Sequence, residues 1–172
     1  EAEKIWELFV PFQGYGFNKA HAASYGIVSY QTAYLKAHYP VEYMTALLTA
    51  ESGHTDKIVE AIAECKRTNI IVLPPDINLS QTQFTIEPNP KSLDGRAIRF
   101  GFSAIKNVGD AAISAILSAR LAGDFKSLTD FCRRVDKRLV NRRAVEALVR
   151  AGSFDSLDAN RASLLASVGR AL

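Results

Sequence analysis

Residues 106–110 read Lys-Asn-Val-Gly-Asp and bring together a cation, a turn and the start of a helical pattern. Asn107 and Gly109 tolerate a positive φ, so they favour a sharp turn, and Val108 between them can anchor that turn in a core. A helix that begins directly after the turn presents free N–H groups and the positive end of its dipole to a phosphate oxygen. These residue types therefore predict a hairpin that holds a nucleic-acid phosphate without reading bases.

Helical patterns are expected on both sides of this turn. Phe102 and Ile105 precede it at helical spacing, and Ile113, Ile116 and Leu117 share one face of the segment after it. The order helix, apolar hairpin, helix is typical of helix-hairpin-helix DNA-binding elements. The alternative interpretation is an ordinary αα-hairpin with an Asn-Gly turn.

The helix after the turn recurs in the sequence. Ala-Ile-x-Ala-Ile-Leu at 112–117 is matched thirty-two residues later by Ala-Val-x-Ala-Leu-Val at 144–149. Such a repeat indicates one supersecondary unit used twice, and two units of this kind can share a core. In this alignment residues 139–141, Leu-Val-Asn, replace Asn-Val-Gly, so the second hairpin lacks the glycine and its turn is expected to be less tight. It carries a basic cluster instead, made up of Lys137, Arg138, Arg142 and Arg143.

Charge placement favours a polyanionic ligand. Residues 96–150 contain 12 Lys and Arg against 5 Asp and Glu, a balance of +7, whereas residues 1–95 contain 7 against 11, a balance of −4. The net charge of +3 therefore conceals a basic block over the two predicted hairpins. Basic blocks attract nucleic acid, and phosphate contacts supply most of the affinity that is independent of base sequence. The alternative is a solvated basic helical face; the two hairpins and the charge asymmetry together favour nucleic acid.

Helices make up most of the elements that must position these residues. After an irregular start, a helix with Tyr25, Val28 and Leu35 at helical spacing is expected from about residue 19 to Pro40. Pro40 can itself open the next helix, which carries Tyr43, Leu47 and Leu48. A further helix is expected from an N-cap at Thr55 to a stop at Asn69, with Ile58, Ile62 and Cys65 on its buried face.

Three short strands are expected between the helical parts. Residues 70–73, 83–86 and 97–100 have strand character and are separated by prolines and turn residues, which predicts a small β-hairpin or meander. After the second hairpin, Gly152-Ser153 breaks the chain, and Asn160 caps a last amphipathic helix. The predicted fold class is therefore mainly α with a small β-hairpin or meander.

Composition excludes several classes of protein. A hydrophobic content of 48% is that of a globular protein, no apolar run approaches the ~20 residues of a membrane span, and no signal peptide is visible. Cys65 and Cys132 lie far apart on predicted helices, which favours reduced, buried thiols. His21, His38 and His54 lack the spacing of metal ligands, so no metal site is expected.

A long motif near the N-terminus is far more specific than the hairpins. Residues 15–25 read Tyr-Gly-Phe-Asn-Lys-x-His-Ala-Ala-x-Tyr, and residues 30–40 read Tyr-Gln-Thr-Ala-Tyr-Leu-Lys-Ala-His-Tyr-Pro. Further matches are Leu-Pro-Pro-Asp-Ile-Asn at 73–78, Gly-Phe-x-Ala-Ile-Lys-Asn-Val-Gly at 101–109, and the segments 131–132, 140–143 and 151–155. Together they strongly resemble the fingers and the adjoining hairpin region of bacterial DNA polymerase III alpha subunits, the C-family replicative polymerases. The resemblance covers nearly the whole chain in the family's order.

This resemblance implies a parent enzyme that is a DNA-directed DNA polymerase of the bacterial cytoplasm, with no membrane partner. Residues 1–72 would form the C-terminal part of the helical fingers, 73–101 a small β element and connector, and 102–172 a tandem helix-hairpin-helix region. The ligands implied are duplex primer-template DNA and, in the parent, the incoming deoxynucleotide. The chain starts with Glu rather than Met and stops in mid-pattern, so a piece of a larger protein is expected.

No catalytic residue, metal ligand or cofactor is expected in this chain. Its acidic residues are scattered over helical positions, whereas two-metal phosphoryl transfer needs clustered carboxylates. The resemblance places the metal-binding aspartates, and hence Mg²⁺, in the parent's palm. It places contacts with the sliding clamp and other replisome subunits in parts outside this chain, because nothing near Leu172 resembles a clamp-binding peptide.

Two sets of binding residues are expected. Asn18, Lys19 and His21 stand at a helix start and could reach a triphosphate or a primer-template phosphate; purely local structural roles are the alternative. The residues expected to bind DNA are Lys106, Asn107, Val108, Gly109, Asp110, Lys137, Arg138, Asn141, Arg142 and Arg143. Two other functions stay open at this point: the same region of a damage-tolerant, error-prone alpha-subunit relative, and a stand-alone protein-interaction module whose basic helices dock on an acidic partner.

Overall fold

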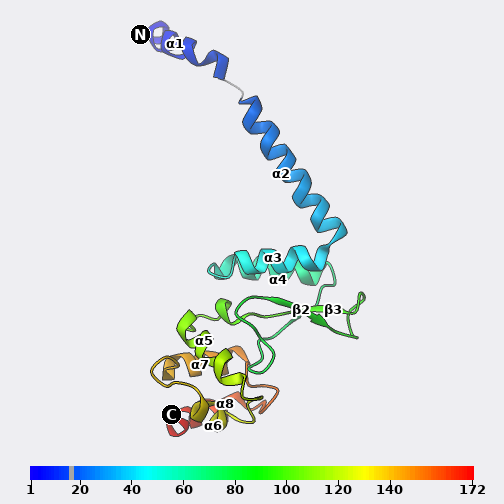
Figure 1. Ribbon diagram of the computed structural model, residues 1–172. Helices are drawn as coiled ribbons and strands as arrows, with labels where there is room; N and C mark the ends of the chain where they lie inside the picture. The colour runs from blue at the N-terminus through cyan, green and yellow to red at the C-terminus, as the bar shows by residue number, and fades with distance from the viewer. Residues whose placement is uncertain (16–17) are drawn as a thin grey trace. The chain divides into compact units, whose positions relative to one another are not determined.

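The computed structural model describes residues 1–15 and 18–172, in two compact units, Glu1–Pro40 and Val41–Leu172 (Figure 1). The expected fold class is confirmed, since the described residues form eight α-helices and one three-stranded sheet. Two residues of the N-terminal motif, Gly16 and Phe17, lie outside the described residues.

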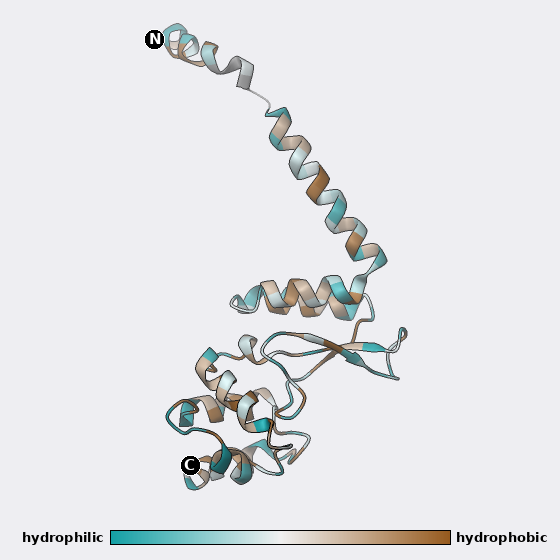
Figure 2. Cartoon of the chain, in the orientation of Figure 1, coloured by the Kyte–Doolittle hydropathy of each residue, from teal (hydrophilic) through white to brown (hydrophobic). Residues whose placement is uncertain are grey.

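The first unit is helical throughout its described part. It contains α1 (Ala2–Phe9), the 3₁₀ helix η1 (Val10–Tyr15) and α2 (Lys19–His38). Asn18 begins α2 as its N-cap, because its side-chain oxygen accepts a hydrogen bond from the His21 N–H at 3.0 Å. The helix was expected, but its apolar positions are not covered: Tyr25 and Val28 are exposed, and apolar bands recur along α2 in Figure 2.

In the second unit, α3 (Pro40–Ala50, of which Pro40 is the boundary residue) and α4 (Thr55–Arg67) pack on the sheet. Pro40 opens α3 as predicted, and Asn69 adopts a φ of 58° where the chain leaves α4. Thr55 was wrongly predicted as the N-cap of α4. It is already helical, and His54 precedes the helix without a side-chain capping bond.

The sheet is smaller and differently bounded than expected. Its strands β1 (Val72–Leu73), β2 (Thr85–Pro88) and β3 (Arg96–Arg99) lie in the order β1-β3-β2. The predicted hairpin is the antiparallel pair β2–β3, in which Ile86 faces Ile98, while β1 runs parallel to β3. Residue 70 stays outside the strand because the Ile70 N–H returns to the Cys65 carbonyl of α4 at 2.8 Å, whereas the Ile71 carbonyl already accepts the Ile98 N–H of β3 at 2.9 Å.

Four more helices complete the second unit. They are α5 (Asp110–Arg120), α6 (Leu128–Arg134), α7 (Arg142–Ala151) and α8 (Arg161–Ala171). The last is capped as predicted, since Asn160 accepts the Ser163 N–H at 3.0 Å. The predicted break after the second hairpin is also present, because Gly152 ends α7 with a φ of 87°.

A full helix before the first hairpin was wrongly predicted. Only a short 3₁₀ turn, η2 (Phe102–Ala104), precedes it. The reason is competition for hydrogen bonds: the N–H groups of Phe102 and Ser103 donate to the carbonyls of Gln81 and Thr82, at 3.0 and 2.9 Å. Gly101 is needed for this close approach, since an added Cβ would collide with the backbone of Gln83.

Two cores hold this unit together. The smaller one joins α3, α4 and the sheet through residues that include Val41, Met44, Cys65 and Ile98. The larger one joins the segment before the first hairpin with α5, α6, α7 and α8. Because the repeated helices α5 and α7 both contribute to this larger core, the two units of the predicted repeat do share one core.

Candidate nucleic-acid interface

The first hairpin is a tight turn anchored by Val108. Asn107 has a φ of 71°, and Val108, only 6% exposed, donates its N–H to the Ile105 carbonyl at 3.2 Å. Asn tolerates the left-handed conformation that most residues avoid. Lys106, Asn107, Gly109 and Asp110 are exposed around the buried valine, so the turn presents its polar atoms to solvent.

Gly109 does not have the conformation expected of it. Its φ is −87° and its ψ is 167°, which is extended backbone open to any residue, and an added Cβ would meet nothing within 4 Å. The left-handed step of the turn belongs to Asn107 alone. Neither the backbone nor the packing of this chain therefore requires glycine at position 109.

The second hairpin repeats the anchor without the left-handed residue. Val140 is fully buried, and the N–H groups of Leu139 and Val140 both donate to the Asp136 carbonyl, at 3.0 and 2.9 Å. Among the non-glycine residues that the structure describes, only Asn69 and Asn107 have a positive φ. The second turn therefore closes through backbone hydrogen bonds in ordinary conformations.

The helices after the two turns start with nearly the same backbone. Gly109 precedes α5 with φ and ψ of −87° and 167°, and Asn141 precedes α7 with −74° and 169°. Their side chains differ in consequence. The Asn141 oxygen accepts the Ala144 N–H at 3.0 Å, whereas Gly109 supplies no such cap. The first turn of α5 thus keeps one more N–H available than α7 does.

Carboxylates of the same segment hold two cations of the second hairpin. Arg138 pairs with Asp136 at 2.9 Å, and Arg142 pairs with Glu146 at 2.8 Å; Glu146 also contacts Arg150 at 3.2 Å. The hydrogen bond from Arg142 holds the pKa of Glu146 below its ordinary value, and that from Arg138 does the same for the pKa of Asp136. Both carboxylates therefore stay ionised at neutral pH and partly offset the basic cluster.

The remaining cations of the predicted site differ in how they are held. Lys137 donates to the carbonyl of Leu172, at the end of α8. Within the described residues, the side chains of Lys106 and Arg143 have no hydrogen bond or ion pair, and both are exposed. These two are the cations of the predicted set most directly available to a phosphate.

The structure adds the end of α8 to this surface. An added Cβ at Gly169 would lie 3.7 Å from Nη1 of Arg142, and the next residue, Arg170, is exposed. Sequence reasoning missed Arg170 because it stands outside the repeat. Its only signal was the position of a cation in the last turn of a capped helix.

Asn18, Lys19 and His21 lie in the other unit, at the start of α2. The Asn18 oxygen is engaged in capping the helix, and the His21 ring lies 4.4 Å from the Tyr25 ring, centre to centre. Lys19 is exposed. Local structural contacts thus account for Asn18 and His21, and they leave Lys19 as the member of this set to test.

Carboxylate and thiol chemistry is not assembled in the described residues. No group of three or more His, Cys, Asp or Glu side chains there could hold a metal ion. Cys65 and Cys132 are both buried, as expected, and burial raises the pKa of the Cys132 thiol. Across residues 1–15 and 18–172, every helix is too short or too polar to cross a bilayer.

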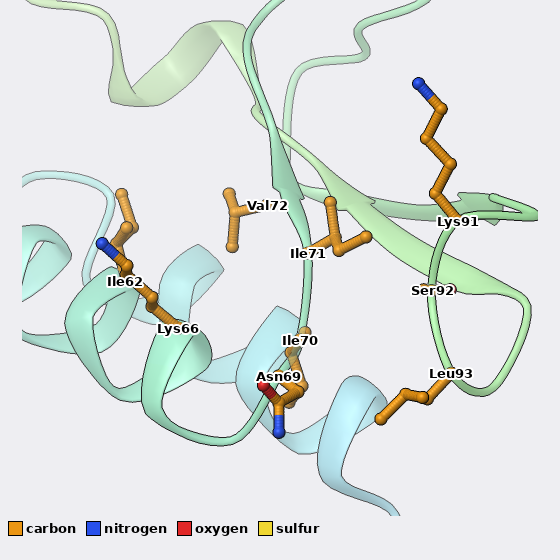
Figure 3. A pocket seen from close by; sticks show the side chains of 9 residues that line it. All are labelled: Ile62, Lys66, Asn69, Ile70, Ile71, Val72, Lys91, Ser92 and Leu93. Atoms are coloured by element: carbon orange, nitrogen blue, oxygen red, sulfur yellow. The ribbon is translucent and has the colours of Figure 1, made fainter.

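One groove of the second unit lies away from the hairpins. A groove of about 620 Å³ runs between α4, β1 and the β2–β3 loop (Figure 3). Lys66 and Lys91 stand at its sides, but its floor is aliphatic, formed by residues such as Ile62 and Ile70. Because the aliphatic part of its lining offers a phosphate no hydrogen bond, the polar contacts of this groove are limited to side chains such as those of Lys66, Asn69 and Ser92.

The repeat and its shared core agree with a known family. The helix-hairpin-helix motif family matches residues 69–164, which include both hairpins. The chain belongs to the helix-hairpin-helix family. This assignment confirms the first interpretation of the Asn-Val-Gly turn over an ordinary αα-hairpin.

Several relatives of this helix-hairpin-helix chain are DNA polymerase III alpha subunits. It is 48% identical to DNA polymerase III subunit alpha of Vibrio cholerae serotype O1 over 172 residues, which are 99% of this chain and 14% of that protein. It is 48% identical to the Thermus aquaticus subunit over 169 residues, 98% of the chain and 13% of that protein. It is 46% identical to the Escherichia coli K12 subunit over 172 residues, again 99% and 14%. The resemblance to these alpha subunits is confirmed, and the chain spans about 14% of the length of such relatives.

Proposed function

We propose that residues 102–172 hold duplex primer-template DNA through its phosphates, without sequence preference, within a polymerase of the DNA polymerase III alpha type. The observation that carries this proposal is the pair of helices that begin thirty-two residues apart with matching backbone, each directly after a hairpin whose valine is buried. Backbone N–H groups and cations at such starts bind phosphate through charge and dipole, and neither reads a base.

At the first hairpin, the backbone is the main binding group. The N–H groups of Asp110, Ala111 and Ala112 have no acceptor inside α5, because the first bond of the helix runs from the Ile113 N–H to the Gly109 carbonyl. A phosphate oxygen placed against Gly109 would accept from them, with the free Lys106 beside it. The Asp110 carboxylate, in the first turn, interacts favourably with the helix dipole and points away from the phosphate.

At the second hairpin, side-chain charge is the main binding group. Arg143 is free, while Arg138 and Arg142 must exchange a carboxylate for a phosphate. Lys137 supplies a further cation near the end of α8. Asn141 contributes by capping α7 and so fixing the direction in which Arg142 and Arg143 leave the helix.

In the same proposal, residues 1–72 are the C-terminal part of the fingers and 73–101 a connector. Lys19 then contacts the incoming deoxynucleotide or a primer-template phosphate, while Asn18 and His21 set the start of its helix. Replacing Lys19 with Ala in the full polymerase should lower kcat/KM for nucleotides by about tenfold or more, since hydrogen bonds to charged groups are worth ~1.5–3 kcal/mol. Unchanged nucleotide kinetics would leave Lys19 a structural residue.

The chemistry of nucleotide addition is proposed to lie elsewhere in the parent polymerase. Mg²⁺ would be held by its palm, and no residue of this chain is assigned to that metal. Sliding-clamp and other replisome contacts are likewise assigned to other parts, and the site of action is the bacterial cytoplasm, at the nucleoid. Primer extension with the purified chain and Mg²⁺ or Mn²⁺ should therefore incorporate no nucleotide above a mock-purified control.

Duplex affinity measured across a salt series tests the central claim. The logarithm of the affinity should fall linearly with the logarithm of salt concentration, and unrelated duplex sequences should give the same line. Heparin, a polyanion without duplex geometry, is the control. Binding of heparin with no binding of duplex DNA would instead favour a module that docks on an acidic protein.

A further inference from the structure

The motif Pro-Pro-Asp-Ile-Asn has no assigned role, yet it folds into a rigid segment of the connector. We call residues 74–80 the strap. Inside it, the Asp76 carboxylate accepts the N–H groups of Asn78 and Leu79 at 2.8 and 3.1 Å. The Ser80 hydroxyl accepts the Asp76 N–H at 2.9 Å and donates to the Phe100 carbonyl at 2.7 Å. The strap is thereby fixed in shape and tied to the end of the sheet.

The strap grips the first repeat at the end of α5. Asn78 pairs with the backbone of Phe125 twice, donating to its carbonyl at 2.9 Å and accepting its N–H at 2.8 Å. Arg120, the last residue of α5, donates to the Ser80 carbonyl at 2.7 Å and the Ile77 carbonyl at 3.3 Å. Arg120 is half-buried by these contacts, and this burial lowers the pKa of its guanidinium.

The strap also grips the second repeat. The Ile77 N–H donates to the Ser153 carbonyl just beyond α7, at 2.7 Å, and the Ile77 side chain is fully buried in the core that both repeats share. Arg134 of α6 holds the end of the first repeat, since it donates to the Ala119 carbonyl at 2.6 Å and lies 4.4 Å over the Phe125 ring. One short segment thus binds the far ends of α5 and α7 together.

These contacts lie far from the proposed phosphate contacts. Asp110 and Arg120 are ten residues apart on α5, a separation of about 15 Å along the helix axis. No strap residue is therefore needed at the DNA; the strap contacts the ends of α5 and α7 that lie opposite their starts. Two binding groups held in fixed geometry bind the same duplex more tightly than two that must be ordered on binding.

We infer that the strap, through Asn78 and Arg120, positions the two hairpins as one pre-organised, two-point grip on duplex DNA. This inference rests on the proposed function. The strap changes no phosphate contact directly. Loosening it should weaken binding while leaving the number of neutralised phosphates, and hence the salt slope, unchanged.

The test uses the full 172-residue chain and the neutral substitution Asn78→Ala, which removes both bonds to Phe125. Duplex affinity should fall by about tenfold with an unchanged salt slope, because the second hairpin then binds with a lower effective concentration. Amide exchange at Phe125 should become faster while the chain stays folded. The matched control is Val41→Ala, which loosens the separate core of α3 and α4 and should change affinity by less than about twofold.

A second variant keeps the test decisive if Asn78→Ala fails to fold. Arg120→Lys retains the charge but not the paired contacts with the strap, and a smaller loss of affinity with the same slope is expected. If the wild type binds duplex DNA and both strap variants bind it as tightly as Val41→Ala does, the inference is overturned while the proposed function stands. No duplex binding by the folded wild type would overturn both the inference and the proposed function.

Discussion

The helices that follow the two hairpins of this chain start with nearly the same backbone, but they differ in the groups they offer to an anion. At the first, Gly109 leaves the start of α5 uncapped, and the nearest cation, Lys106, is free. At the second, Asn141 caps α7, and its arginines are partly engaged by Asp136 and Glu146. One repeat therefore offers mainly backbone N–H groups and the other mainly guanidinium groups.

This difference teaches that internal symmetry in a fold need not mean symmetry in binding. Backbone donors are fixed in place and carry only partial charge, so their contribution depends on shape and little on salt. Guanidinium groups carry full charges, displace counterions and so set the salt dependence of binding. The first hairpin is expected to supply position and the second to supply charge.

The largest expected effect comes from making the first hairpin resemble the second. Gly109→Asn places a capping side chain on a backbone that already matches that of Asn141. The fold should be as stable as before or slightly more so, whereas duplex affinity should fall roughly ten- to hundredfold, because a charged hydrogen bond of ~1.5–3 kcal/mol is lost. The salt slope should stay the same.

Affinity and urea unfolding of the same sample check this prediction. Asn107→Val is the contrasting variant, since it places a β-branched residue at a φ of 71° and should lower the free energy of unfolding by about 1–2 kcal/mol. Unchanged affinity in Gly109→Asn would mean that no phosphate lies against the first hairpin.

The second expected effect lies in the salt slope. Replacing Arg142 and Arg143 together with Ala should flatten the plot of log affinity against log salt by roughly one to two units, at about 0.9 per phosphate. Arg143→Ala alone should account for most of it, because Arg142 is paired with Glu146 and Arg143 is free. An unaltered slope in the double variant would move the DNA contact to another surface.

A third effect concerns stability rather than binding. Asn141→Ala removes the cap of α7 and should lower the free energy of unfolding by about 1 kcal/mol, since the Ala144 N–H loses its acceptor. Asn160→Ala, which uncaps α8, is the matched control and should cost a similar amount. A loss of DNA affinity confined to Asn141→Ala would show that the cap also positions the neighbouring arginines.

The smallest expected effect is a gain. Glu146→Gln removes the carboxylate that holds Arg142 and Arg150, so both become available and the salt slope should steepen by up to about one unit. Little stability should be lost, because exposed ion pairs contribute little. Glu60→Gln, which frees Lys57 on α4, is the charge-matched control and should leave the slope unchanged. Equal slopes for both variants would show that Arg142 does not reach DNA.

Acid should reproduce the effect of Glu146→Gln on this ion pair. Because Arg142 lowers the pKa of Glu146 in the folded chain, the stabilising ion pair is fully formed at pH values above the ordinary pKa of a glutamate. It is lost as the pH falls through the lowered pKa of the folded chain.

The sequence by itself determined the local features of this protein. The buried Val108, the thirty-two-residue repeat, the cap at Asn160 and the left-handed Asn107 all follow from residue types and spacing. The long N-terminal motif and the hairpin pattern were also sufficient to identify the resemblance to DNA polymerase III alpha subunits. These features depend on interactions within a few residues, which a linear pattern records.

Only the tertiary structure decided what depends on partners distant in the sequence. The expected helix at 102–105 shrank to a 3₁₀ turn because the carbonyls of Gln81 and Thr82 accept the N–H groups of Phe102 and Ser103. The pairing of Arg142 with Glu146 lies within one helix and could be read from spacing. The placement of α8 beside Arg142 and the bonds of Asn78 to Phe125 join separate elements and could not. Asn78 and Phe125 are 47 positions apart, and Ile77 and Ser153 are farther apart still; spacing along the chain carries no record of which distant donor meets which acceptor.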